Sequence, residues 1–149
     1  MYSALQIAKW FLAENKIRMI EEDSEYITHL KLQKLLYYAQ GCYLALKNKP
    51  LFREKILAWQ HGPVVEEVYQ QYKHYASEPI VFDEDYDVNE IDSETQAILR
   101  EVFDVFGQYS AWKLREMTHN EEPWKTTRQS EVIDNDKICD YFKREYIEQ

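Results

Sequence analysis

Hydrophobic residues recur with helical spacing along most of the chain. The clearest case is the stretch 30–46, where the apolar positions keep a period of about 3.6 residues: Leu32, Leu35, Leu36, Ala39, Tyr43 and Leu46. Thr28 is a suitable N-cap before this stretch, and Pro50 ends it. Gly41 lies inside the predicted helix. Because glycine costs about 1 kcal/mol against alanine in a helix, we expect another helix to contact Gly41 closely.

Five other stretches show similar spacing. They predict helices over residues 2–14, 63–75, 93–106, 110–117 and 136–147. Ser3 and Ser110 are suitable N-caps for two of them. The sequence SETQ at 93–96 fits a capping box, and Gly107 stands where helices commonly stop.

The remaining segments have little helical spacing. Residues 51–60 read as a short strand or an extended segment, and residues 77–92 as an acidic, turn-rich connector with a short strand at 80–82. A chain of 149 residues suits one domain. We therefore expect a mainly α fold: a single compact helical domain over residues 1–149, with five to seven helices and at most a short β-hairpin near residues 51–60 and 80–82.

The sequence AWQHGP, residues 58–63, precedes one of the predicted helices. Pro63 is suited to a first helical position, because its missing N–H would have no partner there. Gly62 can adopt backbone angles that other residues avoid, and Glu66 lies in the first turn, where negative charge is favourable. We interpret the glycine-proline pair as a sharp entry into the helix 63–75. This interpretation does not explain why Trp59 and His61 precede it.

Charge limits the classes of partner. The net charge is −9, from 27 acidic and 18 basic residues, so phosphate backbones are repelled and we do not expect nucleic acid to be the main partner. The basic stretch HLKLQK, residues 29–34, reads as a solvated helix face carrying Lys31 and Lys34. No apolar run approaches the roughly 20 residues that a membrane span needs, so we expect no membrane partner. Two cysteines do not form a disulfide framework, which favours a reducing, cytoplasmic location.

The candidate chemistry centres on histidine. No histidine pairs with another His or Cys at the spacing of a typical zinc site. A metal site assembled from distant parts of the chain stays open, but we expect no metal and no cofactor. His61 and His119 could act as acid and base if the fold brings them together. We favour the alternative that both rings hydrogen-bond loop backbone and hold the loops in place.

Two predicted loops, WQHGP and THNEEPW, each combine His, Trp and Pro. Aromatic rings with a polar tip anchor many protein interfaces, and they also fill gaps above a core. For Trp59 and Trp124 both readings stay open at this point.

Three stretches taken together resemble a known family. LKLQKLLYYAQGCYLAL (30–46), PLFREKILAWQHGPVVEEVYQQY (50–72) and WKLREMTHNEEPW (112–124) are similar, in order and spacing, to the SocA-like or Panacea antitoxin domain, which also occurs as phage-associated GepA-like proteins. The family pattern is a KLQKLLYY-type helix, an AWxHGPV turn and a segment with W-x-L, TH and PW. The combination is more specific than any one of its parts.

The resemblance implies a mainly helical, non-enzymatic domain that neutralises a cognate protein toxin, encoded next to it, by direct binding. Many members come from phages and prophages. The resemblance also implies a second role, as an adaptor that passes a toxin to a cytoplasmic protease such as ClpXP, or as a phage modulator without its own toxin. A hydrolase-type enzyme using His61 and His119 is the remaining alternative. We place the partner contact on the polar-aromatic loops, at Trp59, His61, Gly62, Pro63, Trp112, His119, Pro123 and Trp124.

Overall fold

Seven α-helices and one two-stranded hairpin make up residues 1–147, the part of the chain that the computed structural model describes. Residues 148 and 149, the end of the predicted domain 1–149, lie outside it. The elements are α1 (Ala4–Glu21), α2 (His29–Lys47), β1 (Leu57–Trp59), β2 (Gly62–Val64), α3 (Glu66–Tyr72), α4 (Ser93–Phe106), α5 (Ala111–His119), α6 (Glu122–Lys125) and α7 (Asn135–Phe142), with short η1 (Lys73–Tyr75), η2 (Val88–Glu90) and η3 (Lys143–Ile147) turns. The predicted mainly α fold with five to seven helices and a short hairpin is confirmed.

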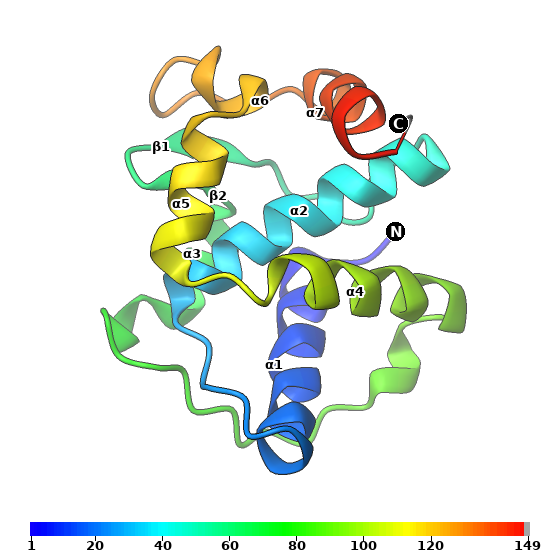
Figure 1. Ribbon diagram of the computed structural model, residues 1–149, viewed down its shortest axis with the longest axis vertical. Helices are drawn as coiled ribbons and strands as arrows, with labels where there is room; N and C mark the ends of the chain where they lie inside the picture. The colour runs from blue at the N-terminus through cyan, green and yellow to red at the C-terminus, as the bar shows by residue number, and fades with distance from the viewer. Residues whose placement is uncertain (148–149) are drawn as a thin grey trace.

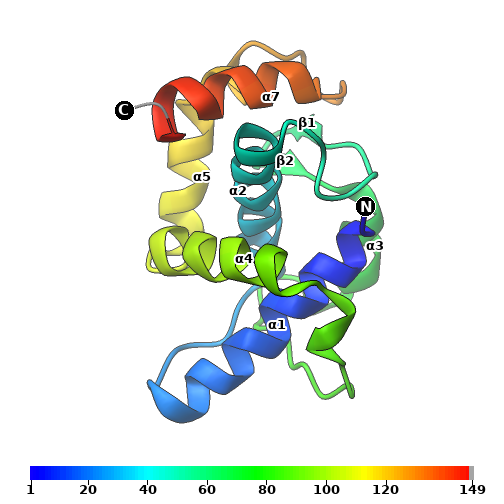
Figure 2. The same cartoon turned by 90° about the vertical axis from the view of Figure 1, so that its right-hand side faces the viewer.

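Helix α2 lies at the centre of the molecule. In Figures 1 and 2 the helices α1, α4, α5 and α7 surround it, and each contacts it, as do β2 and α3. Most of its residues between Leu32 and Ala45 are buried, including the polar Gln33, Lys34 and Gln40. A helix that is covered on all sides has no solvated face. The prediction of a solvated face is therefore wrong for Lys34, although Lys31 remains partly exposed.

Local signals at the two long helices behave as predicted, with one extension. Ser3 caps α1 through a capping box with Gln6, but α1 continues to Glu21 rather than ending near residue 14. The hydroxyl of Thr28 accepts from the Lys31 N–H and caps α2. A Cβ placed at Gly41 would overlap the ring of Phe142 in α7. The predicted close helix contact at Gly41 is confirmed.

The hairpin corrects two predictions. Strand β1 pairs antiparallel with β2, and Trp59 lies opposite Gly62 across a two-residue turn. Gly62 and Pro63 thus belong to a strand, and the helix begins only at Glu66. The side chain of Gln33 explains the delay: it accepts from the N–H of Val65 (2.8 Å) and donates to the C=O of Val65 (3.2 Å), which holds Val65 extended.

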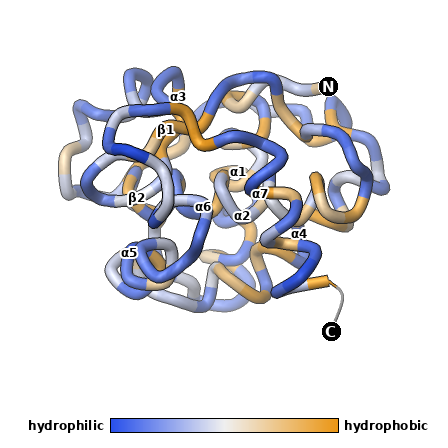
Figure 3. The backbone as a smooth tube through the Cα atoms, turned by 90° about the horizontal axis from the view of Figure 1, so that it is seen from above, coloured by the Kyte–Doolittle hydropathy of each residue, from blue (hydrophilic) through white to orange (hydrophobic). Residues whose placement is uncertain are grey.

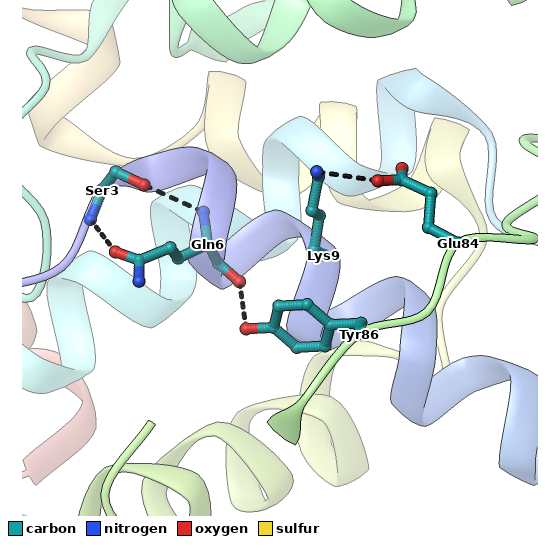
Figure 4. A network of polar contacts seen from close by, with 5 residues as sticks. All are labelled: Ser3, Gln6, Lys9, Glu84 and Tyr86. Carbon is teal, nitrogen blue, oxygen red and sulfur yellow. Dashed lines mark hydrogen bonds and ion pairs between the residues drawn. The ribbon is translucent and has the colours of Figure 1, made fainter. Parts of the chain in front are cut away.

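The connector after α3 runs along α1 without forming a strand. Residues 80–82 were predicted as a strand. Their one backbone–backbone hydrogen bond to the segment just before α2 runs from the Ile80 N–H to the Ile27 C=O, so no strand forms. Farther along, the Tyr86 hydroxyl donates to the Gln6 C=O (2.9 Å), and Lys9 pairs with Glu84 (2.8 Å), as Figure 4 shows. Contacts with α1, rather than with a neighbouring strand, hold the connector in place.

Two boundaries in the second half also differ from prediction. Asp92, not Ser93, caps α4, because its carboxylate accepts from the Thr95 N–H (2.8 Å). The stretch 118–124 was predicted as a loop, but His119 is the last residue of α5 and Pro123 lies in the first turn of α6. Proline is favoured in a first turn. This placement fixes the direction in which Trp124 leaves the backbone.

Candidate partner-binding site

The eight residues predicted to contact a partner come from three elements that lie close together. Trp59, Gly62 and Pro63 lie in the hairpin with His61 at its turn, Trp112 and His119 lie in α5, and Pro123 and Trp124 lie in α6. Figure 3 shows the hairpin, α5 and α6 on the same side of the molecule. Strand β2 contacts α5, and α5 contacts α6. We call this side the hairpin–α5–α6 face. Whether these residues bind a partner stays a prediction.

Trp124 joins α6 to the hairpin. Its indole Nε1 donates to the backbone C=O of Trp59 (2.8 Å), and its ring stacks on His119 with 4.0 Å between ring centroids. Trp59 in turn meets Tyr69 of α3 edge-to-face at 5.0 Å. Both tryptophans are partly buried. Of the two readings left open by the sequence, the contacts of Trp124 support a role in fixing the loops, while both residues stay partly exposed.

Trp112, unlike Trp59 and Trp124, is largely exposed. Its side chain is 64% exposed, and the guanidinium of Arg115, one turn further along α5, lies 4.6 Å from its ring centroid. The Nε of Arg115 donates to the Nδ1 of His61 (3.1 Å). Trp112, Arg115 and His61 therefore form a continuous row from α5 to the turn of the hairpin, with an exposed aromatic ring at one end and an exposed imidazole at the other.

Lys34 lies beneath this row and is fully buried. Its Nζ donates to the C=O of Pro63 (3.1 Å). Burial, and secondly the positive charge of Arg115, lowers the pKa of Lys34 to about 7. Gly62 makes room for it: the residue has φ +113°, and an added Cβ would lie 2.7 Å from the Lys34 Cε and 2.9 Å from the Thr118 hydroxyl. Only glycine combines that backbone angle with that lack of space.

His119 and His61 both lie in this region, but they do not form an exposed acid–base pair, because His61 is exposed and His119 is partly buried. Burial, and then the charge of Arg115, lowers the pKa of His119. Its Nε2 is buried without a hydrogen-bond partner among residues 1–147, and its ring is covered by Trp124. The Nδ1 of His61 is occupied by Arg115. Five cavities of about 190 to 460 Å³ occur elsewhere on the molecule, and neither histidine lines any of these five.

A second buried charge, Glu121, connects α6 to the core. Its carboxylate accepts hydrogen bonds from three phenol hydroxyls: those of Tyr37 (2.9 Å), Tyr38 (2.9 Å) and Tyr146 (2.6 Å). Burial raises the pKa of Glu121, and the three hydroxyl donors oppose that shift. Glu121 thus fixes α6 on α2 and on the C-terminal segment, directly behind the hairpin–α5–α6 face.

Burial divides the eight predicted residues. Gly62, Pro63 and Pro123 are buried and shape the backbone, while His61 and Trp112 are exposed. Sequence reasoning missed Arg115, Lys34 and Glu121 as parts of this region. Arg115 had a usable signal, since it follows Trp112 by three positions on one helix and i, i+3 side chains are neighbours. Lys34 and Glu121 had none, because their burial depends on segments distant in the sequence.

Among residues 1–147, no three His, Cys, Asp or Glu side chains are grouped so that they could hold a metal ion. Within the same described range, no helix has both the length and the apolar character needed to cross a bilayer.

Comparisons with known proteins point in one direction. The sequence model of the family described as "Antitoxin SocA-like, Panacea domain" matches residues 32–125. A stretch of 44 residues is 48% identical to the protein "Antitoxin SocA" of Caulobacter vibrioides (strain NA1000 / CB15N); it covers 30% of this chain and 23% of that protein. No solved structure matches the chain. The family match includes all eight predicted contact residues as well as Lys34, Arg115 and Glu121.

Proposed function

Because the chain belongs to the SocA-like, Panacea domain antitoxin family, we propose that it neutralises a partner toxin by binding it directly through the hairpin–α5–α6 face. The family supports an antitoxin role, and an antitoxin implies a toxin as partner. The observation that carries the proposed surface is the row of Trp112, Arg115 and His61, in which Trp112 and His61 are exposed and Arg115 is half-buried, and which lies inside the matched region. Exposed tryptophan and arginine are the residue types that dominate binding energy at interfaces.

A hydrolase-type role for His61 and His119 has less support. The two rings are held by Arg115 and Trp124 respectively, and the Nε2 of His119 is enclosed. An acid–base pair needs access to a substrate proton. No observation favours the protease-adaptor role over simple neutralisation, and both would begin with the same binding step.

The test is co-expression with the product of the adjacent gene. We expect that protein to stop growth when it is expressed alone and to be harmless when this chain is co-expressed. Binding to the folded chain should also raise its melting temperature by mass action. If the adjacent product is harmless alone, or if it shifts no melting temperature, the pairing is wrong.

Trp112→Ala tests the surface itself. We expect this variant to lose rescue and to bind the toxin more weakly by about 2 kcal/mol, because a central interface tryptophan is a typical hot spot. Its melting temperature should stay close to that of the wild type, because the ring is largely exposed. Val132→Ala, which shortens another exposed apolar side chain, serves as the control and should rescue normally. Full rescue by Trp112→Ala would contradict the proposed surface.

A further inference from the structure

Lys34 and Arg115 bring positive charge without a carboxylate partner in residues 1–147 to the hairpin–α5–α6 face of an acidic chain. Lys34, Arg115 and the two histidines lie together, and the charge interactions that act on Lys34 and His119 there are all repulsions from one another. Among residues 1–147, no carboxylate pairs with Lys34 or Arg115. The chain has 27 acidic residues for such a purpose, and like charges held close together raise the free energy of the folded state. The fold therefore leaves the Arg115 guanidinium, and Lys34 when it is protonated, without a carboxylate partner in residues 1–147, beside the most exposed tryptophan of this face.

Several N–H donors of Arg115, His61 and Lys34 have no acceptor within residues 1–147. A guanidinium has five N–H groups, and in residues 1–147 Arg115 uses only its Nε–H, which donates to His61. Its two terminal amino groups have no acceptor within hydrogen-bond distance in that range. Since the Nδ1 of His61 accepts a hydrogen bond, the neutral ring carries its hydrogen on Nε2, which is then a second donor. Arg115 and His61 together offer a forked set of donors that suits a carboxylate.

Lys34 supports this arrangement from below. It is fully buried, and the only acceptor that residues 1–147 provide for its Nζ is the C=O of Pro63. Two of its three N–H groups have no partner in that range. A buried charge that lacks a counter-charge is costly, and an anion bound above Gly62 would lower that cost. The exposed ring of Trp112 adds an apolar surface beside the donors.

From this geometry we propose that the face binds a carboxylate side chain of the partner protein, seated on the Arg115 guanidinium and the His61 imidazole, with apolar surface of the partner covering Trp112. The proposal rests on the proposed function and names the chemistry that the toxin presents. A protein carboxylate is favoured over a nucleic-acid phosphate, because the cluster is small and the net charge of −9 repels an extended polyanion.

The test uses random peptides displayed on phage and selected against the purified chain. We expect the selected peptides to share an Asp or Glu next to an apolar residue. Calorimetry then measures the best peptide and its Glu→Gln or Asp→Asn version against the wild type, Arg115→Gln and Arg128→Gln. Arg128 is exposed, and its replacement removes the same charge. We expect Arg115→Gln and the neutral peptide each to bind at least about tenfold more weakly, and Arg128→Gln to bind like the wild type.

Three results would overturn the proposal: selection of no peptides or of peptides without acidic residues, equal losses in Arg115→Gln and Arg128→Gln, or a short single-stranded oligonucleotide that binds more tightly than any peptide and depends on Arg115. The co-expression experiment separates this proposal from the antitoxin role. If rescue needs Trp112 but survives Arg115→Gln, the antitoxin role stands and the carboxylate proposal is wrong. If no toxin is rescued while acidic peptides still need Arg115, the antitoxin role fails and the binding site remains.

Discussion

Lys34, a residue of α2, and Glu121, which packs against α2, are both buried ionisable side chains, and their surroundings differ sharply. Glu121 accepts from three hydroxyls, so the fold itself supplies its partners. Lys34 has one carbonyl acceptor within residues 1–147 and the positive charge of Arg115 nearby. Buried polar groups in stable proteins are usually satisfied. The fold satisfies Glu121 with its own donors, whereas it gives Lys34 no anionic partner among residues 1–147.

Glu121→Ala tests whether the buried Glu121 site stabilises the fold, and it has the largest expected effect. The change leaves three tyrosine hydroxyls without their acceptor and opens a space behind α6, so we expect a loss of about 3–5 kcal/mol in the free energy of unfolding. Urea unfolding would measure it. Glu122→Ala is the control, since that exposed residue makes only a surface ion pair with Arg144, worth about 0–1 kcal/mol. Equal losses of unfolding free energy in the two variants would mean that the three hydroxyl donors of Glu121 contribute no more than a surface ion pair.

Gly62→Ala tests whether the hairpin needs glycine at position 62 to leave space for the Lys34 side chain. The alanine would have to keep φ +113° and share space with the Lys34 Cε and the Thr118 hydroxyl. We expect a loss of about 2–3 kcal/mol, from backbone strain and from displacement of the lysine. Gln60→Ala, an exposed position in the same turn, should change stability by less than about 0.5 kcal/mol. Thermal and urea unfolding of both variants would check this. An unchanged free energy of unfolding for Gly62→Ala would show that the hairpin backbone adjusts to the added methyl group without cost.

Lys34→Met tests whether the buried, protonated Lys34 destabilises the fold, and the test uses the dependence of stability on pH. The pKa of Lys34 is about 7 in the folded chain, whereas an unfolded lysine has a pKa of about 10.4. Between these values the unfolded chain binds the proton and the folded chain does not, so wild-type stability rises with pH in that window. Below pH 7 both states are protonated, and the cost of the buried charge is fully present.

We therefore expect Lys34→Met to be more stable than the wild type at pH 6, by about 1–3 kcal/mol, because replacing a buried charge with an apolar side chain of similar size is often stabilising. The difference should shrink as the pH rises to 9. Urea unfolding of both proteins at pH 6, 7.5 and 9 measures it, and other titrating groups cancel in the comparison. Two parallel pH profiles would mean that Lys34 has an ordinary pKa and that the contrast with Glu121 is smaller than its contacts suggest.

The long helices could be predicted from sequence because their signals are local. The apolar period of residues 30–46, the Thr28 cap and the need for a close contact at Gly41 all depend on neighbouring positions, and all three hold. The sequence placed the partner contact on two His- and Trp-bearing loops, but it did not predict that the structure brings the hairpin, α5 and α6 together.

The sequence predictions were wrong or incomplete where contacts with residues distant in the sequence determine the local structure or the burial of a side chain. A glycine-proline pair suits a helix start and an edge strand equally well, and the choice is made by Gln33, which binds the backbone of Val65 from 32 positions away. Lys34 occupies a position on α2 that would be solvated if the hairpin did not cover it. Glu121 looked like an ordinary loop carboxylate because its hydroxyl donors lie 84, 83 and 25 residues away.

The hydrogen bond between Tyr146 and Glu121 has a consequence for synthesis. On the ribosome, Tyr37, Tyr38 and Glu121 emerge before Tyr146 does, so for a time the carboxylate has only two of its three donors. Helix α6 is therefore fully anchored only after Tyr146 has left the exit tunnel and folded back onto Glu121. A chain truncated before Tyr146 lacks this third donor, so we expect its α6 to be held less firmly than α6 of the longer chain.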